Sequence, residues 1–215
     1  MSKRIVTIEQ LDTALQEDLG WRKKEMISIK LLIEKDTTNE AILLRAGIAL
    51  LCAHFEGFLK YASNRYVHFV AEKNITTKAL KNNFAAFKIQ NEITDSEKTE
   101  KNSVHQKLVS KFIEIYEQPF KIYTDVISTN SNPSSSTIKE IVTSLGLTTD
   151  IFNTKNNYID RDLLGNRNKV VHGERYPIHR NDFNETYNII MDLLDKYYEF
   201  IIDAADQKQY LKEGH

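Results

Sequence analysis

An arginine, an asparagine and a histidine lie within residues 167–173, a segment that ends in a glycine. They offer a permanently charged guanidinium, an amide, and an imidazole that changes charge near neutral pH, a set suited to work at a phosphate. On a helix Asn168 and His172 share a face, whereas Arg167 and His172 lie about 140° apart around the axis. The last two would converge on one phosphate if the helix is distorted near Gly173, or if a second copy of the chain supplies the complementary residue.

The same spacing has a purely structural interpretation, because a histidine at a helix C-terminus is stabilised by the helix dipole. The sequence lacks the residues that nucleotide-binding loops and zinc sites require. The glycines are scattered and form no phosphate-binding loop, and neither a paired-cysteine nor a His-Glu-x-x-His zinc motif is present. We therefore expect no metal and no cofactor. The single cysteine, Cys52, lies in an apolar helical run, which predicts a buried thiol rather than a nucleophile.

The composition predicts a helical protein without a basic field. The 215 residues carry 29 Lys and Arg against 30 Asp and Glu, a formal charge of -1, so any binding of anions must be local. Hydrophobic residues make up 41% of the chain, enough for a core, while 3 Pro and 7 Gly are few for a sandwich or barrel.

We expect a cytoplasmic protein without a membrane segment. The N-terminal residues lack the apolar core of a signal peptide. The most apolar stretch, residues 41–53, is shorter than the roughly 20 residues that span a bilayer, and it contains Arg45. A single cysteine also suits a reducing compartment.

Capping-box spacings predict where helices begin. They occur at Thr7 with Gln10, at Thr37 with Glu40, and at Thr137 with Glu140. The first helix is expected to end at about Lys35, the second to be a central helix that reaches Phe69, and the third to stop at Gly146.

The remaining segments complete one all-α domain over residues 1–215, expected to be an antiparallel bundle of about four long helices plus short ones. A polar insertion around residues 90–102 is expected to be a mobile excursion, and the serine-rich residues 128–136 a loop. A helical segment should end at His172 with Gly173 as its cap, and the last helix should cover residues 182–205.

The motif resembles that of the HEPN superfamily, all-helical domains marked by an arginine followed four to six residues later by a histidine, often with a polar residue directly after the arginine. The resemblance covers residues 163–173 and the long amphipathic helix that follows. It extends more loosely to residues 145–148 and 54–60. The combination looks like the stand-alone prokaryotic HEPN-like nucleases of defence and toxin systems.

Many members of that superfamily are metal-independent endoribonucleases that act as dimers, with the two motifs facing each other across a cleft. The resemblance implies that Arg167 and His172 are the catalytic pair and that Asn168 is the polar partner. His172 would be the general acid or base, and Arg167 would hold the phosphate oxygens. Cleavage by the 2′-hydroxyl of the substrate would leave a 2′,3′-cyclic phosphate.

Three further residues are candidates for supporting roles. Lys169 and Arg175 lie close enough in sequence to add RNA contacts, although a solvated surface charge is the favoured interpretation of each. Glu56 on the central helix could face the cleft, remain solvated or pair with Lys60 one turn on.

The sequence departs from the superfamily at one point. Members paired with a nucleotidyltransferase carry a tyrosine two residues after the histidine, whereas this chain has Glu174 there and Tyr176 as its nearest tyrosine. This disfavours control by that enzyme but leaves an antitoxin or another regulatory protein as a partner.

Three functions therefore stay open. The first is a toxin or phage-defence endoribonuclease that acts as a homodimer on RNA. The second is a non-catalytic HEPN-like module that binds a partner protein or a nucleotide, which the near-neutral charge favours. The third is a structural helical adaptor.

Overall fold

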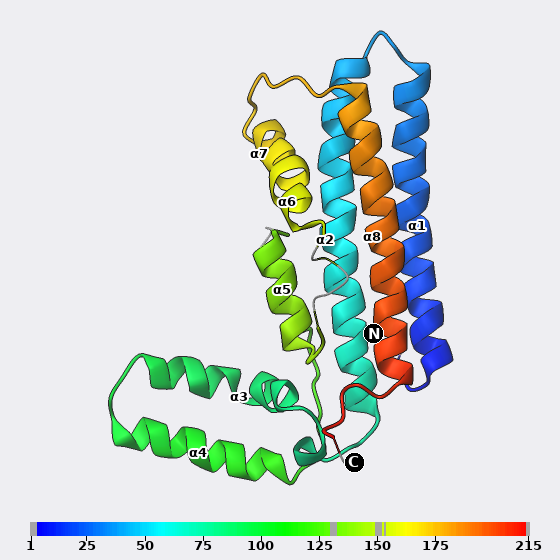
Figure 1. Cartoon of the computed structure of the whole chain (residues 1–215). Helices are drawn as coiled ribbons and strands as arrows, with labels where there is room; N and C mark the ends of the chain where they lie inside the picture. Colours follow the sequence, from blue (N-terminus) through cyan, green and yellow to red (C-terminus); the bar gives the residue numbers. More distant parts are fainter. Residues whose placement is uncertain (1–3, 130–132, 149–151, 153, 214–215) are drawn as a thin grey trace.

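The computed structural model describes residues 4–129, 133–148, 152 and 154–213. Three long helices lie side by side and form the body of the molecule (Figure 1). They are α1 (Ile8–Lys35), α2 (Glu40–Glu72) and α8 (Arg180–Asp206). The regular structure of the described residues is helical apart from two isolated β-bridges, so the predicted all-α fold class is confirmed.

The helices do not all alternate in direction. Helices α2 and α8 run parallel, since Arg180 Nε donates to Glu40 Oε1 at 2.6 Å where both begin, and the Ser63 and Tyr197 hydroxyls lie 2.6 Å apart further along. Helix α1 runs opposite to both (Figure 1). The expected antiparallel arrangement therefore holds for α1 alone, because residues 73–179 form a long crossover that returns the chain to the end where α2 began.

Helix α1 begins as the sequence predicts. Thr7 Oγ1 accepts a hydrogen bond from the Gln10 backbone N–H at 3.2 Å, and Gln10 Oε1 accepts one from the Thr7 N–H at 3.2 Å. The reciprocal pair satisfies two donors that the first helical turn leaves without a partner. The predicted end at Lys35 is also confirmed.

Helix α2 begins differently, and the capping box predicted at Thr37 and Glu40 is wrong. The N-cap of α2 is Asn39, which makes no side-chain capping bond, while Asp36 Oδ1 accepts the backbone N–H groups of Thr38 and Asn39 at 3.0 Å each in the turn before the helix. The side chain of Asp36 thereby holds the tight connection between α1 and α2.

Helix α2 is the core of the molecule. Buried side chains project from it in several directions and include Leu44, Ile48, Leu51, Phe55, Phe58, Leu59, Tyr66 and Val70. Among the described helices it is the one whose length and composition would suffice to cross a membrane, but half of its most apolar window is buried inside the fold. A central packed helix gives the same signal, and the structure is consistent with a soluble protein.

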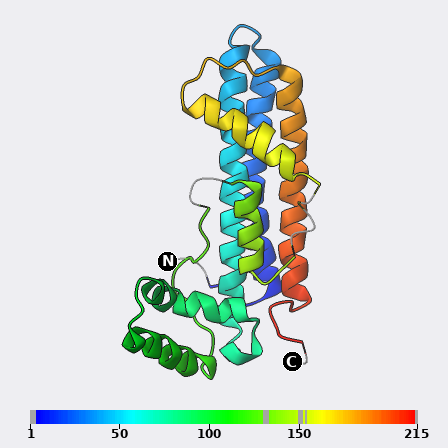
Figure 2. The same cartoon turned by 60° about the vertical axis from the view of Figure 1, so that its left-hand side comes forward.

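A helical hairpin projects from one end of the body (Figures 1 and 2). It follows a short 3₁₀ turn, Thr77–Ala79, and consists of α3 (Asn82–Glu97) and α4 (Asn102–Tyr116). Most of the polar insertion of residues 90–102, expected to be a mobile excursion, is helical and forms the part of α3 that follows a kink at Ile89. Its polar residues lie on a helix that packs against α4 and keeps few residues buried, so the apolar pattern is too sparse to reveal it.

Helix α5 (Ser135–Ser144) follows the serine-rich loop, of which residues 130–132 lie outside the described part of the chain. The capping box predicted at Thr137 and Glu140 is wrong, because Ser134 Oγ accepts the Thr137 N–H at 3.2 Å instead. The predicted stop at Gly146 is confirmed by its left-handed backbone, with φ of 72°.

The closeness of α2 and α8 depends on a glycine. A Cβ atom at Gly47 would lie 2.6 Å from Cε2 of the buried Phe183 ring, whereas one at Gly20 on α1 would meet nothing within 4 Å. We expect Gly47→Ala to lower the free energy of unfolding by about 1–3 kcal/mol through overpacking. The matched Gly20→Ala change should raise it by up to about 1 kcal/mol, because alanine favours helix. Urea unfolding followed by circular dichroism measures both, and equal effects would contradict this packing.

Candidate functional site

The motif lies on a short helical segment that packs against the first half of α2, shown in yellow in Figure 1. The segment comprises α6 (Asn156–Tyr158), a π-helical stretch (Ile159–Leu164) and α7 (Gly165–Val171). The buried side chains of Ile159, Leu163 and Leu164 attach it to the core. Because α7 has only seven residues, this packing rather than helix propensity holds it in place.

The π-helical stretch is also tied to α5. Asp160 Oδ1 accepts the Ser135 backbone N–H at 2.7 Å, and its other oxygen accepts the Ser135 hydroxyl. Asp160 therefore supplies an acceptor for the first turn of α5 from another element. The wider π turn ends before Arg167. The spacing between Arg167 and His172 is therefore that of an α-helix.

Arg167 lies half-buried beside α2, with its Nη1 donating to Asn168 Oδ1 at 3.0 Å. Its charge acts on the thiol of Cys52, which is only 1% exposed. Burial raises the pKa of the Cys52 thiol to about 11, while the charge of Arg167 lowers that pKa and the charge of Glu56 raises it. The expected burial of the thiol is confirmed, and the charge of Arg167 is close enough to α2 to act on it.

Glu56 lies one turn after Cys52 on α2 and is half-buried. Its Oε1 accepts the hydroxyl hydrogen of Thr129, which belongs to the serine-rich loop of residues 128–136. The pairing with Lys60 considered from the sequence is not found between these two described residues. The structure thus brings Glu56 and Arg167 to the same stretch of α2, and the link through Thr129 has no signal in the sequence.

His172 is the C-cap of α7 and is exposed to solvent. The chain turns there by a double hydrogen bond: the Gly173 N–H reaches the Val170 carbonyl at 3.1 Å, and the Glu174 N–H reaches the Lys169 carbonyl at 2.9 Å. Gly173 has φ of 73°, as this turn requires. The predicted glycine stop is therefore confirmed, and the imidazole stands at the open end of the helix.

The two candidate catalytic side chains do not share a helical face. The His172 N–H bonds to the Asn168 carbonyl at 2.9 Å, so the helix is regular up to His172 and the distortion begins only at Gly173. Arg167 and His172 consequently point in directions about 140° apart. The sequence left two ways for Arg167 and His172 to converge on one phosphate, a distorted helix or a second copy of the chain. The regular helix excludes the first.

A residue that the sequence analysis missed holds the turn after the motif. Arg45, half-buried on α2, donates through Nη1 to the carbonyl oxygens of Glu174 at 2.7 Å and Tyr176 at 3.0 Å. The only signal in the sequence was an arginine within an apolar run, which charged residues enter when they have a partner. Arg45 therefore fixes the direction in which the chain leaves His172.

The two candidate RNA contacts differ. The Lys169 ammonium lies 3.6 Å from the centre of the Tyr176 ring, so it stacks on an aromatic face rather than standing fully solvated. Arg175 is exposed on the turn itself. Lys169 lies on α7 and Arg175 follows it, and neither is bonded to Glu56 in the part of the chain that the structure describes.

Other chemistry-bearing residues have structural roles. His54 is 4% exposed, lies 3.0 Å from Glu25 and packs edge-on against Trp21. Burial lowers its pKa, and Glu25 opposes that shift. Within the described residues no group of three or more His, Cys, Asp or Glu side chains is arranged to hold a metal ion.

The left-handed turn behind His172 can be tested by substitution. No atom crowds Gly173, so the cost of Gly173→Ala comes from its positive φ alone and should be about 1–2 kcal/mol of unfolding free energy. Gly173→Asn should cost less, because asparagine tolerates this backbone conformation. Urea unfolding compares the two variants, and an alanine variant as stable as wild type would contradict the required turn.

Comparison with known proteins gives one family. The family model described as RiboL-PSP-HEPN matches residues 17–203, a span that runs from α1 to the end of α8 and includes α7. No curated protein and no solved structure matches the chain. A family match over most of the sequence, together with the all-helical fold, shows that this chain belongs to the RiboL-PSP-HEPN family.

Proposed function

We propose that the protein is a metal-independent endoribonuclease whose catalytic pair is Arg167 and His172. The observation that carries the proposal is the arrangement on α7: an exposed imidazole at the helix end, and a half-buried arginine five residues earlier joined to Asn168. Membership of a HEPN family supports a nuclease-like activity in a general way.

The residue types suit cleavage by the substrate's own 2′-hydroxyl. His172 accepts the proton of that hydroxyl as its oxygen attacks the adjacent phosphorus. The bond from phosphorus to the 5′-oxygen breaks, and the leaving oxygen takes a proton. The products are a 2′,3′-cyclic phosphate and a free 5′-hydroxyl. Arg167 hydrogen-bonds the non-bridging oxygens, whose negative charge grows in the transition state, and Asn168 orients the guanidinium.

The proposed active form is a homodimer. Arg167 and His172 diverge on one regular helix, and a two-fold axis beside α7 would bring the arginine of each protomer toward the histidine of the other. The exposure of the end of α7 leaves room for such a contact. In this arrangement Lys169 and Arg175 extend the surface that meets the RNA.

The proposed setting is the cytoplasm, in a toxin or phage-defence system with an antitoxin or regulatory protein as partner. A second function, a non-catalytic module that binds a protein or nucleotide, is favoured by one observation, the formal charge of -1 on the whole chain. An RNA-binding protein usually carries an excess of cations, at least locally.

Cleavage of end-labelled tRNA and messenger RNA in the presence of a chelator tests the catalytic assignment. We expect wild type to leave 2′,3′-cyclic phosphate ends, and His172→Ala and Arg167→Ala each to lose about 100-fold or more in rate. His105→Ala and Arg161→Ala are matched controls, since both residues are exposed and lie outside the catalytic pair. These controls should cut as wild type does.

Two results would contradict the assignment. Equal cleavage by wild type and His172→Ala would show that the activity comes from another site or protein. Absence of cleavage by wild type, with a regulatory protein or nucleotide bound instead, would favour the binding module. Circular dichroism of each variant confirms that a lost activity is not a lost fold.

The composite site predicts complementation between two inactive variants. In a mixed dimer of Arg167→Ala and His172→Ala, one site loses both residues while the other keeps the arginine of one protomer and the histidine of its partner. Co-expressed variants should therefore regain about a quarter of wild-type activity if subunits mix at random. Sites contained within single protomers would regain none, and sedimentation showing only monomer would exclude the shared cleft.

A further inference from the structure

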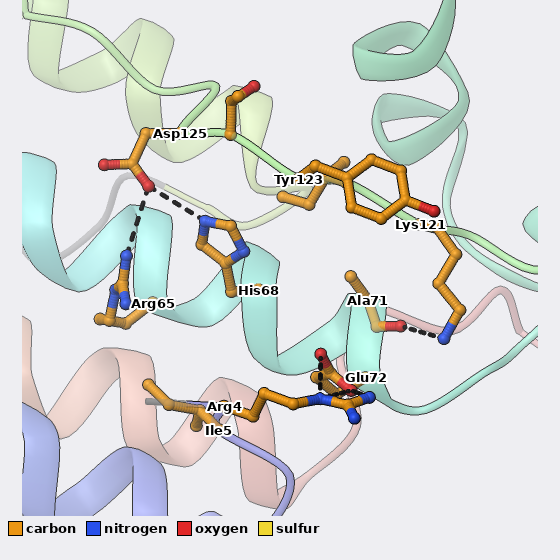
Figure 3. Close-up of a pocket in the computed structure, with 11 residues that line it drawn as sticks. Arg4, Ile5, Arg65, His68, Ala71, Glu72, Lys121, Tyr123 and Asp125 are labelled. Carbon is orange, nitrogen blue, oxygen red and sulfur yellow. Dashed lines mark hydrogen bonds and ion pairs between the residues drawn. The ribbon is translucent and has the colours of Figure 1, made fainter. Parts of the chain in front are cut away.

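A cavity apart from the motif lies at the far end of α2 from its N-terminus, between α2, the N-terminal segment and the extended chain of residues 121–125 (Figure 3). Its volume is about 740 Å³, within the range of small-ligand sites. Charged side chains from all three elements line it, among them Arg4, Arg65, His68 and Lys121.

Two carboxylates hold three of these side chains in place. Arg4 forms a fork with Glu72, with the closest approach of 2.6 Å, and Asp125 Oδ1 lies 3.3 Å from Arg65 Nη2 and 3.0 Å from His68 Nε2 (Figure 3). Arg4 is 77% exposed in its side chain, so its pair with Glu72 is mostly in solvent. Solvent-exposed pairs are weak and yield to a competing anion at small cost.

Lys121 lines the cavity and bonds to a backbone carbonyl instead of a carboxylate, as do Lys88 and Lys73, which lie outside its lining. Lys121 Nζ donates to the Ala71 carbonyl at 3.2 Å, in the last turn of α2 (Figure 3). Lys88 Nζ donates to the Lys121 carbonyl at 3.0 Å, and Lys73 Nζ to the Val6 carbonyl at 2.8 Å. A carbonyl positions an ammonium group without cancelling its charge.

The end of the bundle therefore carries a local excess of positive charge in a chain of formal charge -1. Three cations, those of Arg4, Arg65 and Lys121, line the cavity against the two carboxylates of Glu72 and Asp125. His68 adds a further charge when protonated. The local balance supplies the cationic surface that the overall composition lacks.

An aromatic ring stands at the edge of the same cavity. Tyr123 is 89% exposed although it is a large apolar side chain, and it lies on the extended chain between Lys121 and Asp125. An exposed ring beside cationic groups is the arrangement by which proteins hold single-stranded nucleic acid, with a base stacked on the ring and phosphates on the cations.

The cavity is connected to the motif along α2. The chain that carries Tyr123 and Asp125 continues to Thr129, whose hydroxyl binds Glu56 near Arg167. Along the helix axis Arg65 lies about 20 Å from Cys52, on which the charge of Arg167 acts, and about 30 Å from Arg45, which holds the chain after His172. A few nucleotides of an extended strand span such distances.

We propose that this cavity is an accessory binding site for single-stranded RNA, which holds a phosphate at Lys121 and Arg4 and stacks a base on Tyr123. The inference rests on the proposed ribonuclease function and extends it, since it places a part of the substrate away from the scissile bond. A free nucleotide shares this chemistry of phosphate and base, and the experiment separates it from an RNA strand.

The test measures binding rather than cleavage. A fluorescein-labelled single-stranded RNA is titrated by fluorescence anisotropy with full-length His172→Ala protein, which leaves the strand intact. In that background Tyr123→Ala should weaken binding about fivefold or more, while Tyr123→Phe keeps the ring and should bind normally. Lys121→Gln should reduce the slope of log affinity against log salt by roughly 0.7, the share of one phosphate contact.

Lys24→Gln, an exposed lysine on α1, is the matched control and should change neither value. Unchanged affinity in Tyr123→Ala would overturn the accessory site, even if His172 proves essential for cleavage. Failure of the His172→Ala protein to bind RNA would overturn it as well. Adenosine monophosphate that binds in a Tyr123-dependent manner, with RNA binding unaffected, would assign the cavity to a free nucleotide instead. The cleavage assay judges the catalytic pair independently of all these results.

Discussion

The apolar surface of α2 has to be covered on several sides, and this requirement organises the molecule. Helices α1 and α8 cover part of it, while the segment containing α7 packs on another part through Ile159, Leu163 and Leu164. A helix as short as α7 would not form alone in water. The motif is therefore ordered because its neighbours in sequence bury their side chains against α2, and its position depends on the same contact.

Two local interactions determine how the motif faces solvent. The left-handed Gly173 ends α7 directly behind His172, and Arg45 holds the departing chain by two carbonyl oxygens. Asn168 in turn accepts a hydrogen bond from Arg167. The result is a pre-arranged cation and an accessible imidazole on separate faces of one helix, a geometry that suits a site completed by a second protomer better than one within a single chain.

Charge is distributed by the fold rather than by composition. The formal charge of -1 gives no reason to expect a nucleic-acid surface, yet lysines that bond to carbonyl oxygens keep their charge at the far end of α2. Near the motif, Arg167 and Glu56 both act on the buried Cys52. Local fields of opposite sign can thus coexist on a nearly neutral chain, because each depends on which side chains the fold brings within a few ångströms of one another.

The sequence by itself determined the helices with strong apolar periodicity, the start of α1 at Thr7, the stop at Gly173 and the residues of the motif, because each depends on contacts only a few positions apart. It failed where several polar residues compete for one cap, as at Ser134 before α5, and where a helix buries little, as in α3. Only the tertiary structure decided the parallel course of α2 and α8, the bond between Glu56 and Thr129, and the cationic cavity, since these follow from the path of a long crossover and leave no local pattern.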